Sequence, residues 1–333
     1  MADGANAEAA TNRTRPTKKM STLLFTHPAF LAHDTGPGHP ERPDRMRAID
    51  KVLSHEIFAR LVRKEAPLRD DVEERILLAH SEKHLAGMRG IAEAALKGPR
   101  HIDGDTVVSE GTWEAALRAV GAGLAAVDAV VEGSAANAFC QVRPPGHHAE
   151  AGRAMGFCLF SNAAIAGLYA RRKHGAERIA VVDFDVHHGN GTQDIFRSDK
   201  DLFYGSTHEM PLFPGTGAAT ERGVGNITNV PLRAGDGGER FREAFESRIL
   251  PALHNFGPDI VIISAGFDAH EDDPLANLRL VEADYLWATE KLADAANRHC
   301  NGRIVSMLEG GYDLTALARS VAVHVKALMD AGA

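Results

Sequence analysis

Short apolar runs alternate along the chain with longer stretches in which apolar positions recur at helical spacing. Because the short runs are apolar on both faces and are separated by helices, we expect a parallel sheet covered on both sides, an α/β fold. β-branched residues predict strands at 22–27, 138–142, 178–184, 201–206, 259–265 and 303–308. Helical spacing predicts helices near 43–62, 82–96, 112–132, 161–174, 239–255, 279–299 and 314–329.

The domain organisation follows from the same pattern. No repeat, low-complexity block or linker interrupts residues 21–333, so we interpret them as a single domain. Residues 1–20 contain no apolar run, and we expect a disordered N-terminal tail there.

Polar residues gather where four of the predicted strands end. Each strand is followed by a glycine-rich loop that carries histidine, aspartate or tyrosine. Because open α/β sheets bind ligands at the carboxyl ends of their strands, we expect the four loops to form one site. The loops read RPPGHHAE, DVHHGNGT, GFDAHEDDP and EGGYDL, and they follow the strands at 138–142, 178–184, 259–265 and 303–308.

The second of these loops suggests a metal site. Asp185 and His187 are two residues apart and point to the same side of an extended segment. Asp268, at another strand end, is the best third ligand. Two carboxylates and one imidazole suit a catalytic Zn²⁺, although Fe(II) or Co(II) would also fit. The simpler alternative is that Asp183 and Asp185 only cap the following helix.

The first and last loops supply groups for proton transfer. His147 and His148 are adjacent, and hydrolysis of an amide needs a base for water and an acid for the leaving amine. Asp183 is a candidate to orient one imidazole, and Asn190 to accept from the other. Tyr312 follows two glycines and could donate to a tetrahedral oxyanion. The alternatives are a helix cap or second metal site for the histidines and a structural tyrosine.

Composition narrows the function classes. The chain has 37 basic and 45 acidic residues, a formal charge of -8, which argues against a general nucleic-acid partner. Three cysteines cannot form a disulfide framework. There is no signal-peptide pattern and no run of about 18 apolar residues, so we expect a cytoplasmic enzyme with no membrane partner.

Seven ordered motifs carry a family resemblance. The chain resembles the histone deacetylase and acetylpolyamine amidohydrolase family, most closely its bacterial class II-like members, from Leu23 to Leu317. The resemblance implies a three-layer, arginase-like fold with a central, mostly parallel eight-stranded sheet. The motifs are RPPGHHA, GFCLFSNAA, VVDFDVHHGNGT, FYGSTHE, FPGTG, SAGFDAHEDDPLA and LEGGYDL.

The resemblance also implies roles for the polar residues. It makes His147 the histidine that contacts the water on zinc and a buried aspartate. It makes His148 the general base and acid, and Tyr312 the residue that polarises the scissile carbonyl. Asn190 stands where class I members have aspartate, as in class II proteins. The implied zinc ligands are Asp185, His187 and Asp268, and the implied buried aspartate is Asp183.

Substrate contacts and potassium sites are implied in the same way. Phe157 and Phe213 match the walls of an acyl-lysine tunnel that Gly156 also lines. Arg45 matches an arginine of an internal cavity, and Asp105 a rim aspartate that binds substrate. One implied potassium site comprises Asp183, Asp185, His187, Ser206 and Thr207, and a second comprises Phe196, Asp199, Leu202 and Asn226.

We therefore expect a zinc-dependent amidohydrolase that cleaves an acetyl-lysine-like amide to an amine and a carboxylate. One alternative is an acetylpolyamine deacetylase. Its acidic gatekeeper position is occupied here by Leu275, although Glu271, Asp272 and Asp273 are close in sequence. We also consider a catabolic amidase for small N-alkyl amides or xenobiotic anilides, and a non-catalytic metal-binding module. For a member of this family, a homodimer and a homotetramer are both reasonable.

Overall fold

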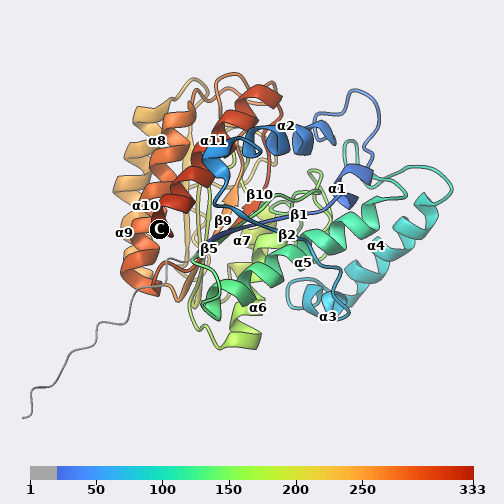
Figure 1. Cartoon of the computed structure of the whole chain (residues 1–333), viewed down its shortest axis with the longest axis horizontal. Helices are drawn as coiled ribbons and strands as arrows, with labels where there is room; N and C mark the ends of the chain where they lie inside the picture. Colours follow the sequence, from blue (N-terminus) through green and yellow to red (C-terminus); the bar gives the residue numbers. More distant parts are fainter. Residues whose placement is uncertain (1–20) are drawn as a thin grey trace, which may run out of the picture.

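The centre of the molecule is an eight-stranded parallel sheet, shown in the computed structural model of residues 21–333 (Figure 1). The tail predicted for residues 1–20 lies outside the described residues. Every neighbouring pair of strands is parallel, and the order across the sheet is β2-β1-β5-β10-β9-β6-β7-β8. The strands are β1 (Thr22–Thr26), β2 (Val62–Glu65), β5 (Asn137–Cys140), β6 (Ile179–Asp183), β7 (Leu202–Glu209), β8 (Ile227–Leu232), β9 (Ile260–Ala265) and β10 (Ile304–Leu308).

Helices cover both faces of this sheet and complete three layers (Figure 1). One face carries α5 (Thr112–Val131) and α6 (Asn162–His174), with α1 (Ala29–Ala32), α3 (Val72–Ile76), α4 (Glu82–Ala95) and α7 (Asn190–Phe196) around them. The other carries α2 (Asp44–Leu53), α8 (Gly238–Ala244), α9 (Leu250–Phe256), α10 (Glu282–Cys300) and α11 (Leu314–Ala331). A small hairpin of β3 (Arg100–His101) and β4 (Val107–Val108) lies apart from the sheet. None of the described helices combines the length and the apolar character needed to cross a membrane.

All six predicted strands are present, but the sequence analysis missed the two edge strands. All four residues of β2, VRKE, are exposed, and β8 alternates between buried and partly exposed positions. An edge strand needs only one partner and has a solvated side, so it lacks a continuous apolar run. The helix predicted at 43–62 was wrong at its end, because α2 stops at Leu53 and β2 begins at Val62.

The four strands that carry the polar loops are neighbours in the middle of the sheet. β5, β10, β9 and β6 lie side by side in that order, and every residue in them is buried. Since all four are parallel, their carboxyl ends reach the same edge. The predicted convergence of the four loops is therefore confirmed.

A buried ion cluster fastens this edge to the N-terminal part of the chain. Glu41, Arg45 and Arg143 are fully buried. Arg143 donates to both carboxylate oxygens of Glu41, and Arg45 Nη1 lies 3.1 Å from Glu41 Oε1. Burial alone would raise the pKa of Glu41, but Arg143 and His33 hold that pKa well below its usual value. The carboxylate is therefore charged and compensates two buried guanidinium groups.

Replacing that carboxylate should destabilise the fold. Glu41→Gln leaves Arg45 and Arg143 buried without a counter-charge, and breaking such a pair costs about 3–5 kcal/mol of the free energy of unfolding. Urea unfolding at neutral pH measures the change. The matched control is Glu114→Gln, which breaks the Arg118 pair of a half-exposed glutamate and should cost less than about 1 kcal/mol. Equal losses in the two variants would contradict the assignment.

Candidate active site

Three of the predicted residues form a compact group of metal-ligand type. Asp185 and His187 follow β6, and Asp268 follows the adjacent strand β9. His187 Nδ1 lies 3.1 Å from Asp185 Oδ1 and 3.1 Å from Asp268 Oδ2. Ligand atoms of all three residues lie within 4.8 Å of one another, and all three are buried. The group can therefore hold one metal ion.

A second group of this kind among the described residues is less suited to a metal. It consists of Asp128, Glu132 and His174 and is partly exposed. Asp128 already pairs with Arg69 at 2.8 Å and with Lys173 at 3.1 Å. With its carboxylate neutralised by these cations, the group is a surface ion-pair network.

Backbone amides fix the two carboxylates of the buried group. Val186 N donates to Asp268 Oδ1 at 2.8 Å, and Gly310 N donates to Asp185 Oδ2 at 2.8 Å. A Cβ atom at Gly310 would lie 2.1 Å from Asp268 Oδ2, so only glycine fits there. The glycines of these loops are therefore required by the close approach of backbone to carboxylate.

The electrostatics of the group favour a positive charge between the carboxylates. Burial lowers the pKa of His187, but its hydrogen bonds to Asp185 and Asp268 outweigh burial and raise that pKa to about 10. Burial and then the charge of Asp185 raise the pKa of Asp268 to about 7. Two like charges held this close repel each other unless a cation lies between them, and a divalent ion supplies that charge.

The two adjacent histidines have different hydrogen-bond partners. His147 Nδ1 lies 3.0 Å from Asp183 Oδ2, which also accepts from the Tyr204 hydroxyl at 3.0 Å. His148 Nδ1 lies 2.9 Å from Asn190 Oδ1. Burial lowers the pKa of His147, but Asp185 and Asp183 outweigh burial and raise it well above its usual value. His147 is therefore the charged member of the pair.

Hydrogen bonding also fixes the tautomer of His148. Asn190 Nδ2 donates to Glu150 Oε1 at 2.7 Å, so the amide oxygen of Asn190 must face the imidazole. His148 Nδ1 then carries the proton, and Nε2 keeps its lone pair. Burial, followed by the charge of His147, holds the pKa of His148 well below its usual value. This imidazole is neutral and can accept a proton.

Tyr312 lies at the same site with its phenol protonated. Its side chain is 8% exposed, and its ring centroid is 5.1 Å from the Arg45 guanidinium and 5.9 Å from that of Phe157. Burial and then the charge of Asp268 raise the pKa of Tyr312 well above its usual value. The phenol is therefore a hydrogen-bond donor.

One cavity of about 530 Å³ brings most of the predicted substrate contacts together. Phe157 has a left-handed φ of 68°, and Phe213 packs 5.0 Å from the His148 ring. The lining includes Gly156, Phe157, Phe213, Leu275 and Asp105 together with His148, His187 and Tyr312. Arg45 does not line this cavity. It lies fully buried behind the Tyr312 loop and donates to Gly311 O at 2.7 Å.

The structure also reveals contributors that the sequence analysis did not assign. His39 lines the cavity, packs 4.9 Å from Phe157, and has its Nε2 2.9 Å from Asp105 O. Glu309 is fully buried and accepts from His147 N at 3.1 Å, from Gly146 N at 2.7 Å and from Ser264 Oγ at 3.0 Å. A charged residue at the end of an otherwise apolar strand was the available signal for Glu309.

The residues of both predicted potassium sites are also close together. Asp183 on β6 pairs in register with Ser206 on β7, and Thr207 follows it. Among the described residues, Thr207 Oγ1 is buried and has no hydrogen-bond partner. At the second site, the carbonyl oxygens of Phe196, Asp199 and Leu202 all lie within 3.0 Å of Asn226 Nδ2.

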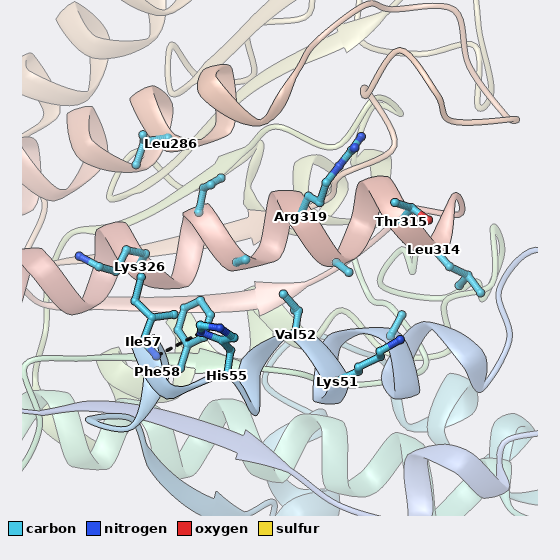
Figure 2. Close-up of a pocket in the computed structure, with 14 residues that line it drawn as sticks. Lys51, Val52, His55, Ile57, Phe58, Leu286, Leu314, Thr315, Arg319 and Lys326 are labelled. Carbon is cyan, nitrogen blue, oxygen red and sulfur yellow. Dashed lines mark hydrogen bonds between the residues drawn. The ribbon is translucent and has the colours of Figure 1, made fainter.

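A larger hollow, of about 750 Å³, lies between α2 and α11 (Figure 2). Its lining is mainly apolar and includes Val52, Leu314 and Ala322. Lys326 and Arg319 also line it, but no carboxylate does. It contains one imidazole, His55, but no group of metal-ligand residues such as the smaller cavity has, so the smaller cavity is the candidate active site.

Comparisons with known proteins agree with this geometry. A family model described as the histone deacetylase domain matches residues 39–328. The chain is 39% identical over 281 residues to a histone deacetylase-like amidohydrolase of Pseudomonas aeruginosa, covering 83% of this chain and 73% of that protein. It is 39% identical over 324 residues to the chloroplastic histone deacetylase 14 of Arabidopsis thaliana, covering 92% and 76%. The crystal structure of the HDA15 HD domain superimposes with a TM-score of 0.87 at 36% identity, covering 94% of this chain and 89% of that one.

The fold and the site are those of an α/β enzyme in which a buried group of metal-ligand residues lies at the carboxyl edge of a parallel sheet. The chain belongs to the histone deacetylase family. Membership indicates a deacetylase or amidohydrolase, that is, a hydrolase acting on amides. The fold expected from the resemblance is confirmed.

Adding one methyl group at Gly310 should impair metal binding. The Cβ of Gly310→Ala would overlap Asp268 Oδ2 and crowd Asp185 Oδ2. Displaced carboxylates should lower the affinity for a divalent cation by about 10- to 100-fold, measured by competition with a chromogenic chelator. The control is Gly104→Ala, where an added Cβ meets nothing within 4 Å in the same cavity. Unchanged affinity in Gly310→Ala would refute this account of the glycine.

Proposed function

We propose that the chain is a zinc-dependent amidohydrolase that cleaves an acyl amide of the acetyl-lysine type to an amine and a carboxylate. The observation that carries this proposal is the meeting of three kinds of group in one cavity. A metal-ligand group, a neutral imidazole and a protonated phenol are represented there by His187, His148 and Tyr312. Hydrolysis of an amide by a metal-activated water uses all three.

The ligand set fits zinc. Asp185, His187 and Asp268 offer two carboxylate oxygens and one imidazole nitrogen within 4.8 Å of one another. Catalytic zinc sites use three protein ligands and leave a position for water or substrate. When bound, Zn²⁺ supplies Lewis acidity toward the scissile carbonyl and lowers the pKa of a water molecule. Because the set is rich in oxygen, Fe(II) and Co(II) are the competing ions.

The side chains of this site divide the proton transfers. His148 Nε2, with its free lone pair, takes a proton from the attacking water and later gives it to the leaving amine. His147 stays charged beside Asp183 and stabilises the negative charge that develops nearby. Tyr312 donates its phenolic hydrogen to the carbonyl oxygen as it becomes an oxyanion.

The cavity favours an uncharged acyl-alkyl chain. Phe157 and Phe213 offer aromatic faces to the methylene groups of an acyl-lysine, and Leu275 lines the same cavity. An acetylpolyamine carries a distant ammonium, for which an acidic partner is expected at the mouth. Neither Glu271 nor Asp272, the acids close to Leu275 in sequence, lines the cavity, and the carboxylate that does is Asp105, the predicted rim residue. We therefore rank acetyl-lysine-like amides before acetylpolyamines and small xenobiotic amides.

We also propose that potassium supports the site structurally. The carbonyl oxygens of Phe196, Asp199 and Leu202 converge within 3.0 Å of Asn226 Nδ2, so three oxygen ligands face one small space. Beside Ser206, the buried hydroxyl of Thr207 has no partner among the described residues. Carbonyl and hydroxyl oxygens are the donors that a hard monovalent cation prefers.

Removing either proposed catalytic group should abolish most turnover. We expect His148→Ala or Tyr312→Phe to lower kcat on an acetyl-lysine peptide by about 100-fold or more, because each variant lacks a group needed in the transition state. Steady-state kinetics measure the effect, and circular dichroism checks the fold. Near-normal turnover in both variants would sink the proposed mechanism.

Metal removal and a substrate panel test the remaining parts of the proposal. Chelation should abolish activity, and one equivalent of Zn²⁺ should restore it in the wild type but not in Asp185→Ala, which lacks a ligand. The restored enzyme is then compared on an acetyl-lysine peptide, acetylputrescine and simple N-alkyl amides, with zinc measured on the same sample. Faster hydrolysis of acetylputrescine than of the peptide would reverse the ranking of substrates. A metal-loaded protein inert toward every amide would instead support a binding module.

A further inference from the structure

Asp273 is a buried carboxylate that the proposed chemistry does not use. It lies five residues after Asp268 and is 7% exposed. Its Oδ2 accepts from Tyr312 N at 2.7 Å, and its Oδ1 accepts from Leu275 N at 3.0 Å. Burial raises the pKa of Asp273 to about 6, so the group is ionised at the pH of an ordinary assay near 7.5. One charged carboxylate thus holds two peptide groups of the active-site cavity.

Asp273 completes a set of bonds around the turn that carries Tyr312. Arg45 holds the carbonyl of Gly311 at 2.7 Å, and Asp185 holds the amide of Gly310 at 2.8 Å. Phe267 N donates to the carbonyl of Gly310 at 3.0 Å. The peptide amide of Tyr312 itself is held by Asp273. The glycines make this turn flexible in principle, so its fixed shape depends on these partners.

The geometry excludes a substrate-binding role for this acidic segment. A carboxylate that binds a substrate ammonium must face the cavity, but Asp273 is not among the residues that line it, and its two oxygens face the amides of Leu275 and Tyr312. Asp272 is 56% exposed and pairs with Arg319. The third acid, Glu271, is exposed and does not line the cavity. Asp273 acts on the protein and not on the substrate.

We propose that Asp273 is a positioning residue that holds the Tyr312 peptide so that its phenol faces the scissile carbonyl, and that it ties this peptide to Leu275 at the wall of the cavity. The inference rests on the proposed function, in which Tyr312 donates to the oxyanion. Because the phenolic oxygen is the far end of the side chain, a small rotation of the Tyr312 peptide displaces it further. A displacement of about 1 Å can cost about 100-fold in rate.

The first test is Asp273→Asn in the zinc-loaded enzyme. The amide has nearly the same shape but offers one acceptor oxygen and places an NH₂ group against a backbone amide. We expect kcat on an acetyl-lysine peptide to fall about 10- to 100-fold, with KM and zinc content nearly unchanged. The control is Asp272→Asn on the same loop, which should stay within about twofold of the wild type. Wild-type kcat in Asp273→Asn would overturn the inference.

A double variant separates positioning from general damage. With the phenol absent in Tyr312→Phe, the orientation of residue 312 no longer affects the oxyanion. Adding Asp273→Asn in that background should lower kcat by no more than about twofold. A full further loss would show that Asp273 acts elsewhere. Normal turnover in Tyr312→Phe alone would refute the proposed function, whereas loss in Tyr312→Phe with normal turnover in Asp273→Asn would refute only the role of Asp273.

A measurement on the unaltered protein covers the case in which Asp273→Asn does not fold. Amide hydrogen exchange of Tyr312 reports whether its N–H is bonded to a buried acceptor. We expect this amide to exchange much more slowly than that of Gly104, an amide in a loop of the same cavity. Exchange of the Tyr312 amide at the rate of an exposed loop amide would contradict the proposed contact.

Discussion

Two carboxylates that repel each other, Asp185 and Asp268, dominate the organisation of this protein. Each is buried at the end of a different strand, and both face His187 Nδ1 at 3.1 Å. Holding them together requires rigid backbone donors and a positive charge, because like charges in a low-dielectric interior otherwise separate or bind protons. The central parallel strands supply the rigidity, and the group formed with His187 can hold a metal ion that would supply the charge. Gly310, the two adjacent histidines and the turn that carries Tyr312 all lie next to this pair of carboxylates.

Buried charges also set the protonation states of the two adjacent histidines, His147 and His148. His147, next to Asp183, and His148, next to Asn190, are adjacent in the sequence, but their pKa values are shifted in opposite directions. Burial lowers both pKa values, but the charges of Asp185 and Asp183 outweigh it at His147, whereas the charge of His147 adds to it at His148, whose partner Asn190 is uncharged. The amide is itself oriented by Glu150. Thus one pair of identical side chains can carry both a fixed charge and a proton acceptor.

Much of this arrangement was predictable from the sequence, and the reasons are physical. Strands buried on both faces leave continuous apolar runs, so the six inner strands and the convergence of their loops were predicted correctly. The edge strand β2 reads VRKE and gives no such signal. At the site, metal-ligand spacing singled out Asp185 and His187, which the structure brings together with Asp268. Glu309 and Asp273, in contrast, accept from the amides of His147 and Tyr312, which are distant in sequence. Such contacts depend on the folded path of the chain, so the local sequence can mark Glu309 as unusual at the end of an apolar strand but cannot show which amides it binds.

The position of β10 has a consequence for how the protein is made. This strand follows all the other strands in sequence, yet it lies between β5 and β9 in the middle of the sheet. A nascent chain in which residues 304–308 have not yet been synthesised therefore lacks a central strand and cannot complete the sheet. The turn with Gly310 and Tyr312 arrives with the same segment. Assembly of the candidate site thus waits until residues 304–312 have been made, and a chain that stops before them leaves β5 and β9 without the strand that joins them.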